Sequence, residues 1–390
     1  MAQSRVRTTE KSTLTANGAR RRRNLSRAGY LEAKLGFRNY WYPAAFSHEL
    51  AGGQALGVRL LGENILLRRV GERTMAVADR CLHRGVRFSR KLECYTDDTI
   101  TCWYHGFTYR LSDGKLVEIL TEPGSSLVGK LALKTYPVTE TKGIVFVYIG
   151  EREPGELGHD VPPNFLDPEL EIDGIHDHVN ANWRMGAENG FDTTHIYIHR
   201  DSPLIPGNDL MLPLGLCPGD RHGISTYSDS EPKGVLDHTF ESYQPVFEAA
   251  IDGRTVARSK GVNNRNIVAR EVSIWMPGAL KVDPWPDPAL IQFEWYVPID
   301  VDTHTYWRVL GKRVAGAAEA AAFHEEFHSR WESLALHGFN DDDIRAREGM
   351  QEFYQRDEAW DEEHLFKPDR CIVEWRQLAS RHHRGIQPIA

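Results

Sequence analysis

Two short stretches, Cys81-Leu82-His83 and Cys102-Trp103-Tyr104-His105, carry the strongest information about the fold and chemistry of this chain. Each stretch begins with a cysteine and ends with a histidine, and eighteen residues separate the two. Thiolate and imidazole groups are ligands that transition metals prefer. Four such groups at this spacing therefore predict a metal centre that is held between two tight loops.

The order of the ligands indicates which kind of centre to expect. One cysteine and one histidine on each loop fit a Rieske [2Fe–2S] cluster, in which two thiolates bind one iron and two imidazoles bind the other. Neutral imidazoles in place of thiolates raise the reduction potential of the cluster. We therefore expect the chain to transfer single electrons. A structural zinc site is the alternative for the same four residues.

Size and composition exclude several classes of protein. The 390 residues are enough for two domains, and the net charge of −8 argues against a general nucleic-acid binder. A transmembrane helix is not expected, because the sequence contains no run of eighteen apolar residues. Five cysteines are too few and too scattered for a disulfide framework, which fits the cytoplasm. Cys94, between the two metal-binding loops, is expected to be a buried thiol.

The pattern of strands and helices predicts an α+β protein in two parts, preceded by a flexible extension over residues 1–29. Residues 30–160 alternate short strands with turns and predict a small all-β domain that carries the cluster. Residues 161–390 mix strands with helices and predict a larger antiparallel sheet surrounded by helices. The expected elements include hairpins around residues 62–64 and 113–114, strands at 143–149, 292–297 and 306–310, and helices at 315–336, 343–356 and 371–382.

A second metal site is indicated by His195 and His199. On a helix, histidines four residues apart lie on one face, and Asp192 would fall on the same face. Two histidines at this spacing are more often structural, but an electron-carrying cluster upstream requires an acceptor. Two histidines and one carboxylate are typical of non-haem Fe(II) oxygenases.

The third ligand of this site could come from the run Asp341-Asp342-Asp343. This run lies where a helix is expected to begin, so one carboxylate could cap the helix while another faces the metal. Alternatively, all three could be first-turn acids that complement the helix dipole. The spacing alone leaves open which aspartate binds.

Together these motifs resemble the large subunit of Rieske non-haem iron ring-hydroxylating oxygenases, and among them the carbazole-type members. The resemblance begins at Ala33 and covers nearly all of the chain that follows, with its most specific strings at residues 188–199, 203–216, 292–300 and 338–340. Trp103 stands where proline is usual in the family. The carbazole-type members share this tryptophan, so it supports the narrower resemblance.

The resemblance implies roles for individual residues. The cluster ligands would be Cys81, His83, Cys102 and His105, and the ligands of a mononuclear iron would be His195, His199 and Asp343. Asp192 would connect a cluster histidine of one subunit to an iron histidine of its neighbour. A homotrimer is implied, because the two centres of one chain are too far apart in the family for efficient electron transfer.

The activity that the resemblance implies is insertion of both atoms of O₂ at the angular 1,9a position of carbazole and related tricyclic aromatics. The product would open to 2'-aminobiphenyl-2,3-diol. Electrons would come from a ferredoxin, and NADH would act only indirectly through a reductase, since the sequence has no G-x-G-x-x-G unit. One alternative is a Rieske monooxygenase or demethylase that acts on another aromatic. A second is an electron carrier without a catalytic iron.

Substrate and partner contacts are also implied by matching positions. A flat tricyclic substrate needs an apolar slot with few polar groups, and the backbone carbonyl of Gly190 could accept a hydrogen bond from the substrate N–H. The slot would be lined by Ile196, Leu214, Leu216, Val272, Trp285 and Phe339, each of which could instead be an ordinary core residue. The ferredoxin could dock on four basic residues beside the first loop. These are Arg84, Arg87, Arg90 and Lys91. Alternatively, the four residues could simply form a solvated face.

Overall fold

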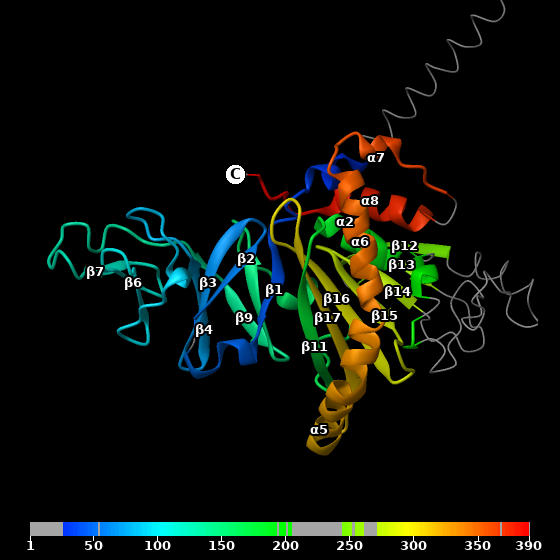
Figure 1. Ribbon diagram of the computed structural model, residues 1–390, viewed down its shortest axis with the longest axis horizontal. Coiled ribbons are helices and arrows are strands. Elements are labelled where there is room, and N and C mark those ends of the chain that lie inside the picture. Colours follow the sequence, from blue (N-terminus) through cyan, green and yellow to red (C-terminus); the bar gives the residue numbers. More distant parts are fainter. Residues whose placement is uncertain are drawn as a thin grey trace, which may run out of the picture.

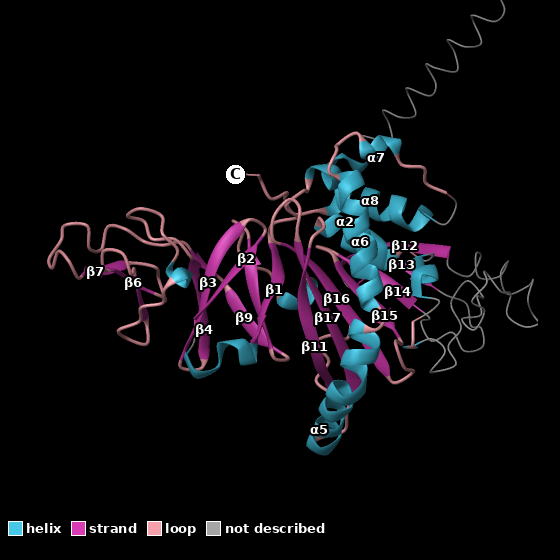
Figure 2. Ribbon diagram, viewed as in Figure 1, coloured by secondary structure: helices cyan, strands magenta, loops and turns pink. Residues whose placement is uncertain are grey.

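The computed structural model describes residues 26–53, 55–192, 195–199, 202–204, 244–251, 254–260, 271–366 and 369–389. Along the longest axis, small antiparallel sheets occupy one end and a seven-stranded sheet with helices the other (Figure 1). Figure 2 shows that the α-helices gather around the large sheet, whereas the other end is built of strands and loops. The predicted α+β fold is confirmed.

Three small sheets form the strand-rich part. Their orders are β2-β3-β4-β8, β5-β6-β7 and β1-β10-β9. The strands are β1 (Tyr40–Phe46), β2 (Ala55–Leu60), β3 (Glu63–Val70), β4 (Arg73–Ala78), β5 (Thr99–Thr101), β6 (Phe107–Arg110), β7 (Leu116–Ile119), β8 (Thr135–Tyr136), β9 (Val138–Thr141) and β10 (Ile144–Ile149). Short 3₁₀ helices interrupt the loops at η1 (Ser47–Gly53), η2 (Phe88–Arg90) and η3 (Leu157–His159).

Two sequence predictions in this part are confirmed. The hairpins lie where the glycine turns indicate, and Gly62 and Gly114 both have positive φ, of 80° and 70°. The expected buried strand is β10, which is buried at every position because it pairs with β1 on one side and β9 on the other. One prediction is wrong: Cys94 is exposed, because it lies on a loop before β5 whose residues mostly face solvent.

A single antiparallel sheet forms the centre of the second part. Its order is β11-β17-β16-β15-β14-β13-β12, and the expected pair of strands at 292–297 and 306–310 is β16 with β17. β16 is buried along its whole length. The strands are β11 (Leu170–Val179), β12 (Gln244–Ile251), β13 (Arg254–Lys260), β14 (Glu271–Trp275), β15 (Ala279–Asp283), β16 (Leu290–Pro298) and β17 (His304–Arg313).

Helices cover this sheet, and the expected helix over residues 315–336 is helical in two geometries. An α-helix, α5 (Ala317–Glu326), continues as a π-helix, η5 (Phe327–His337), which leads directly to α6. Turns of π geometry are rare, and those that exist often lie next to functional sites. The other helices are α2 (Trp183–Phe191), η4 (His195–His199, a 3₁₀ helix), α6 (Asn340–Tyr354), α7 (Ala359–Glu362) and α8 (Arg370–His382).

Helix α2 lies unusually close to the sheet. A Cβ atom added to Gly186 would come within 2.6 Å of the Tyr296 ring, and one added to Gly190 would meet the Tyr296 hydroxyl at 1.9 Å. Only glycine fits at these two positions, which lie four residues apart on one helix face. The glycine pair therefore lets the end of α2 approach β16 closely.

A buried ionic network fixes α2 from its other side. Arg376 on α8 is 2% exposed and donates to Glu188 of α2, at 2.6 and 2.8 Å, and to Glu363. Arg27, which lies on a helix over residues 26–32, forms ion pairs with Glu363 and Asp361. Residues 26–29 thus belong to this helix and not to the predicted flexible extension. Residues 1–25 lie outside the described residues.

Among the described residues, no helix has both the length and the apolar character needed to cross a membrane.

His304, at the start of β17, is a buried histidine whose pKa reports on the packing under α2. It is fully buried, and its Nδ1 contacts the carbonyl of Ala181 at 2.6 Å. Burial, with help from the nearby Arg347 charge, lowers the pKa of His304 from 6.5 to about 3. The unfolded chain binds a proton below pH 6.5 that the folded chain does not, so stability falls as pH drops through this window.

We predict that His304 contributes about 2 kcal/mol to the loss of stability between pH 8 and pH 5, at about 1.4 kcal/mol per pH unit below 6.5. Denaturant titrations of wild type and His304→Gln at both pH values measure this difference. The exposed control His382→Gln should keep the wild-type pH dependence. An unchanged dependence in His304→Gln would contradict the prediction.

Candidate metal centres

The two loops of the first site have the same backbone design. In each, the cysteine N–H donates to a carbonyl five residues later, from Cys81 to Val86 and from Cys102 to Phe107, at 2.9 and 2.8 Å. A glycine four residues after each cysteine donates back to it at 2.9 Å. Gly85 and Gly106 have φ of 75° and 71°, which favours glycine. The Cys-x₃-Gly spacing, which the sequence analysis did not use, is thus the signal for these loops.

The four predicted cluster residues come together at the end of these loops. Both cysteines are 1% exposed and neither forms a disulfide. The imidazoles of His83 and His105 are edge to face with centroids 4.6 Å apart. His83 is exposed and stacks on Phe107 at 4.8 Å. Thiols thus lie on the inner side, the exposed His83 imidazole lies on the outer side, and His105 is half-buried between them.

Trp103 links the two loops. Its indole N–H donates to the carbonyl of Arg87 at 2.9 Å, across from the second loop to the first. Proline at this position would have no such donor. The departure from the usual family residue therefore has a structural role, because it holds the two halves of the site together.

The donor set of this first site fits a Rieske cluster. Burial raises the pKa of the Cys102 thiol, and the adjacent Cys81 thiol raises it further. Two neighbouring buried thiols gain from a metal, which takes up the charge of their thiolates. The Nδ1 atom of His105 is buried and has no hydrogen-bond partner within the described residues. Coordination to a metal ion would satisfy this nitrogen.

The second site lies where α2 ends. Asn182 caps the start of α2, and its side chain accepts from the N–H of Arg184 at 3.1 Å. Asp192 ends the helix with an extended backbone (φ −67°, ψ 120°). The expectation that Asp192 shares a helix face with His195 and His199 is therefore wrong, since the two histidines belong to the separate helix η4.

Asp192 nevertheless orients His195 through its backbone. Its carbonyl accepts a hydrogen bond from Nδ1 of His195, which leaves Nε2 of His195 directed to Asp343. A histidine that donates from one nitrogen is held in the tautomer that can bind a metal through the other. The backbone at the end of α2 thus sets the chemistry of the first histidine.

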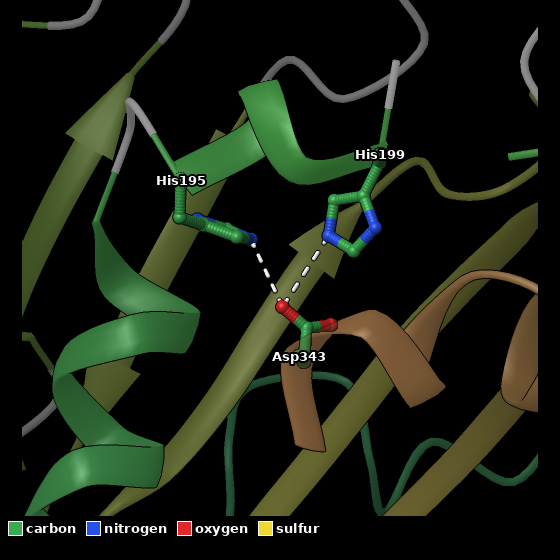
Figure 3. A group of neighbouring side chains, drawn as sticks. All are labelled: His195, His199 and Asp343. Atoms are coloured by element: carbon green, nitrogen blue, oxygen red, sulfur yellow. Dashed lines mark ion pairs between the residues drawn. The ribbon is translucent and has the colours of Figure 1, made fainter. Parts of the chain in front are cut away.

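Figure 3 shows His195, His199 and Asp343 pointing toward one another. One oxygen of Asp343, Oδ1, lies 3.4 Å from Nε2 of His195 and 3.3 Å from Nε2 of His199. The ligand atoms of the three residues all lie within 4.8 Å of one another. Within the described residues, this is the one group of at least three histidine, cysteine or acidic residues that meets such a test.

The structure distinguishes the three consecutive aspartates. Asp341 faces Arg308, whose Nη1 lies at 3.3 Å. Asp342 binds the exposed Arg345 at 2.6 Å through Oδ1, while its Oδ2 lies 3.9 Å from Nδ1 of His199. Asp343 faces the two histidines and is 2% exposed. All three are in the first turn of α6, so the helix dipole favours each of them, but their side chains serve different partners.

The second site fits a metal ion. Both ring nitrogens of His199 and Oδ1 of Asp343 are buried without a hydrogen-bond partner among the described residues. Buried polar atoms are costly when they are unsatisfied, and one cation would satisfy these. Burial opposes ionisation of Asp343, but the neighbouring His199 and His195 charges hold the pKa of this carboxyl well below its usual range. The carboxylate is the form that binds a metal.

Two predicted slot residues lie beside this site. Phe339 stacks on the ring of His199, with centroids 3.6 Å apart and planes inclined by 14°. Trp285 packs against Phe339 at 4.9 Å and is 7% exposed. Val272 is partly buried on β14 and packs against the main core. Gly190 is in the last turn of α2, where carbonyls lack partners within the helix.

Three predicted slot residues cannot be compared with the structure. Leu214 and Leu216 lie outside the described residues, and for Ile196 the backbone alone is described, within η4. The predicted basic group is exposed at all four positions, beside the first loop: Arg84, Arg87, Arg90 and Lys91.

Sequence analysis missed a buried polar layer behind Asp343. Asn340 donates from Nδ2 to Oδ2 of Asp343 at 3.0 Å, and Gln292 contacts Asn340. Gln292, Glu294 and Tyr296 alternate along β16, so all three face one side of the sheet. Polar residues at alternate positions of an otherwise apolar strand are the signal that could have revealed this layer.

The two candidate centres lie at opposite ends of the folded molecule. The loops of the first site adjoin β5, β6 and β7, at the far end of the long axis from α2 and α6 (Figure 1). Within one chain the two sites are therefore well separated.

Comparisons with known proteins agree with this geometry. A family model described as homotrimeric ring hydroxylase matches residues 148–387, and one described as Rieske [2Fe–2S] domain matches residues 40–137. The terminal oxygenase component of carbazole 1,9a-dioxygenase from a Sphingomonas species is 55% identical over 360 residues, 92% of this chain and 95% of that protein.

Solved structures give the same result. The terminal oxygenase of carbazole 1,9a-dioxygenase from Novosphingobium sp. KA1 superposes with a TM-score of 0.84 and 48% identity, covering 95% of this chain and 100% of that one. A reduced complex between oxygenase and ferredoxin in carbazole 1,9a-dioxygenase gives a TM-score of 0.82 and 45% identity, covering 94% and 95% of the two chains.

The different partners of Asp342 and Asp343 lead to a prediction. Asp343→Asn should weaken Fe(II) binding at the second site by more than about 100-fold, because loss of a supporting contact alone costs 10–100-fold. Asp342→Asn removes the exposed pair with Arg345 and a 3.9 Å contact with Nδ1 of His199 but no ligand atom, so it should weaken Fe(II) binding by no more than about tenfold. Anaerobic Fe(II) titration with the cluster absorbance as internal standard measures both. Equal losses in the two variants would contradict the geometry.

Proposed function

Because this chain belongs to the homotrimeric ring hydroxylases and carries a Rieske [2Fe–2S] domain, we propose that it is the terminal oxygenase of a carbazole 1,9a-dioxygenase. It adds both atoms of O₂ to two adjacent carbons of carbazole and related tricyclic aromatics, the angular carbon 9a and its neighbour, carbon 1. Two electrons and two protons complete the addition. The diol then opens at its carbon–nitrogen bond to 2'-aminobiphenyl-2,3-diol.

The observation that carries this proposal is the 55% identity with a carbazole 1,9a-dioxygenase oxygenase component over 92% of this chain. Fold alone would not carry it, because one fold supports many substrates. The two family models together span both metal sites, over residues 40–137 and 148–387.

We assign the metal ligands as follows. Cys81, His83, Cys102 and His105 hold the cluster, and His195, His199 and Asp343 hold the mononuclear iron. When bound, the iron supplies a centre for O₂ with open coordination positions, and the cluster supplies electrons one at a time. The convergence of two imidazoles on one carboxylate oxygen supports the second assignment.

The chain's own residues position the reactants. Trp285 and Phe339 form an apolar wall next to His199, which suits a flat aromatic substrate and excludes water. The carbonyl of Gly190 is at the end of α2, where it can accept the N–H of the substrate. The remaining slot residues are Ile196, Leu214, Leu216 and Val272.

Electron transfer takes place across a subunit boundary in this proposal. The two candidate sites of one chain lie at opposite ends of the molecule (Figure 1), so the residues that would hold the cluster in one subunit would work with those that would hold the iron in its neighbour in the homotrimer. Asp192, partly exposed at the end of α2, connects the two centres. A ferredoxin delivers the electrons and docks on Arg84, Arg87, Arg90 and Lys91, and a reductase draws them from NADH.

The proposal also covers the domain boundaries and the location of the protein. The Rieske domain spans residues 30–160 and the catalytic domain residues 161–390. Sparse cysteines and a ferredoxin donor support a cytoplasmic location.

The experiment that tests this function is turnover of carbazole by the purified protein with a matched ferredoxin, reductase and NADH. We expect 2'-aminobiphenyl-2,3-diol, identified by mass spectrometry. His195→Ala should keep the cluster absorbance and lose turnover. Formation of a monohydroxylated or demethylated product from another aromatic, with none from carbazole, would favour a monooxygenase or demethylase instead.

Asp192 leads to a further prediction. Asp192→Asn keeps the backbone carbonyl that orients His195 but removes the charge of the connecting carboxylate. Cluster oxidation in a single turnover should slow by at least about tenfold, the usual effect of losing a supporting contact at a metal centre. Stopped-flow absorbance of the pre-reduced protein measures this rate, and iron content checks both sites. A wild-type rate with both sites filled would exclude the connecting role.

A further inference from the structure

The two oxygens of the Asp343 carboxylate have different surroundings. Oδ1 faces His195 and His199 at 3.4 and 3.3 Å and is buried without a hydrogen-bond partner among the described residues. Oδ2 accepts a hydrogen bond from the Asn340 side chain at 3.0 Å. Both residues are at most 3% exposed, so water does not compete for this bond. One oxygen is therefore available to a metal, and the other is already engaged.

The orientation of the Asn340 amide is fixed by its partners. Its NH₂ must face the Asp343 carboxylate, which has no proton to donate in its ionised form. Its oxygen then faces the NH₂ of Gln292 at 3.3 Å. The same NH₂ of Gln292 donates to Oε1 of Glu294 at 2.5 Å. Two amides in series thus run from the Asp343 carboxylate to the buried carboxyl group of Glu294. The NH₂ group of Gln292 serves both of its neighbours, and its oxygen is buried without a hydrogen-bond partner among the described residues.

The far end of this series is held rigidly. Glu294 is 4% exposed, and its second oxygen accepts from the hydroxyl of Tyr296. Arg347 of α6 lies 4.0 Å from Glu294 and donates to Asn189 of α2 at 2.7 Å. The anchor residues Glu294 and Tyr296 stand on β16, an interior strand of the large sheet, and Arg347 connects them to α6 and α2, the two helices next to the metal site. The Asn340 amide consequently has little freedom to turn away from Asp343.

We propose that Asn340 is a positioning residue that makes Asp343 bind the iron through Oδ1 alone. It keeps Oδ2 from becoming a second ligand, so a coordination position stays open beside the two histidines. The inference deepens the proposed function and rests on it, in that Asp343 is taken as an iron ligand. Gln292 and Glu294 act through Asn340, because they hold its amide in the required orientation.

A structural role in the first turn of α6 is the competing explanation. Asn340 opens this helix, and Asp343 follows three residues later, so their bond could simply stabilise the helix start. The chain offers a matched control for that possibility. Asn180 donates from its side chain to Glu348 of the same helix at 2.9 Å, but at an exposed position. Asn180→Leu removes an asparagine–carboxylate bond to α6 without touching the metal site.

The experiment compares wild type, Asn340→Leu, Gln292→Glu and Asn180→Leu as full-length protein with the Rieske cluster intact. Mononuclear iron is removed with a chelator, and Fe(II) is titrated back without oxygen. Nitric oxide is then added as a probe. The oxidised cluster is diamagnetic, so the electron paramagnetic resonance signal of the ferrous–nitrosyl centre reports on the mononuclear site alone.

We expect Asn340→Leu to weaken Fe(II) binding about 10–100-fold and to change the rhombicity of the nitrosyl signal. Gln292→Glu keeps the side-chain shape but loses both N–H donors, so it should change the signal in the same direction. Gln292→Glu also keeps the proposal testable if Asn340→Leu does not fold. Asn180→Leu should match wild type in both affinity and signal. Wild-type affinity and signal in both Asn340→Leu and Gln292→Glu would overturn the positioning role.

Failure of the proposed function would give a different result. If His195→Ala still bound Fe(II) with wild-type affinity and signal, the iron ligands themselves would be wrong. If His195→Ala lost the signal while Asn340→Leu kept it unchanged, the ligand assignment would stand and the positioning role alone would fail. A changed cluster absorbance in Asn340→Leu would mark general misfolding, and Gln292→Glu would then decide the proposal.

Discussion

Burial of the Asp343 carboxylate is the constraint on which the catalytic part of this protein depends. A charge that is 2% exposed is costly unless opposite charge and hydrogen bonds surround it. Two imidazoles face one of its oxygens and an amide faces the other. The glycine pair that lets α2 approach β16, and the Arg376 network behind α2, bring these groups into place although they take no part in the chemistry.

The other end of the chain meets a different requirement. Its two loops bury the thiols and present His83 outward, and Trp103 joins one loop to the other. An exposed His83 suits a centre that must pass electrons to another molecule. Because the second site lies at the opposite end of the same molecule (Figure 1), the proposed function pairs each centre with that of a neighbouring subunit.

Local signals made much of this structure predictable from sequence. The glycine turns, the buried strand β10 and both histidine motifs depend on residues close together in the chain. Asp192 could not be placed, because the end of α2 is set by a backbone turn after Phe191. The aspartates 341–343 could be separated only by their partners, such as Arg308 on β17, which lies 33 residues earlier. Cys94 was misjudged because burial of a loop thiol depends on tertiary contacts.

The buried polar layer of Gln292, Glu294 and Asn340 belongs to neither metal-binding motif. In our proposal it explains why one oxygen of Asp343 is free for a metal.

The central claim, that two oxygen atoms enter one aromatic ring, is tested most directly by isotope labelling. Carbazole turned over under ¹⁸O₂ in ordinary water should give a diol in which both hydroxyl oxygens are ¹⁸O. A product that carries one labelled oxygen would contradict the account.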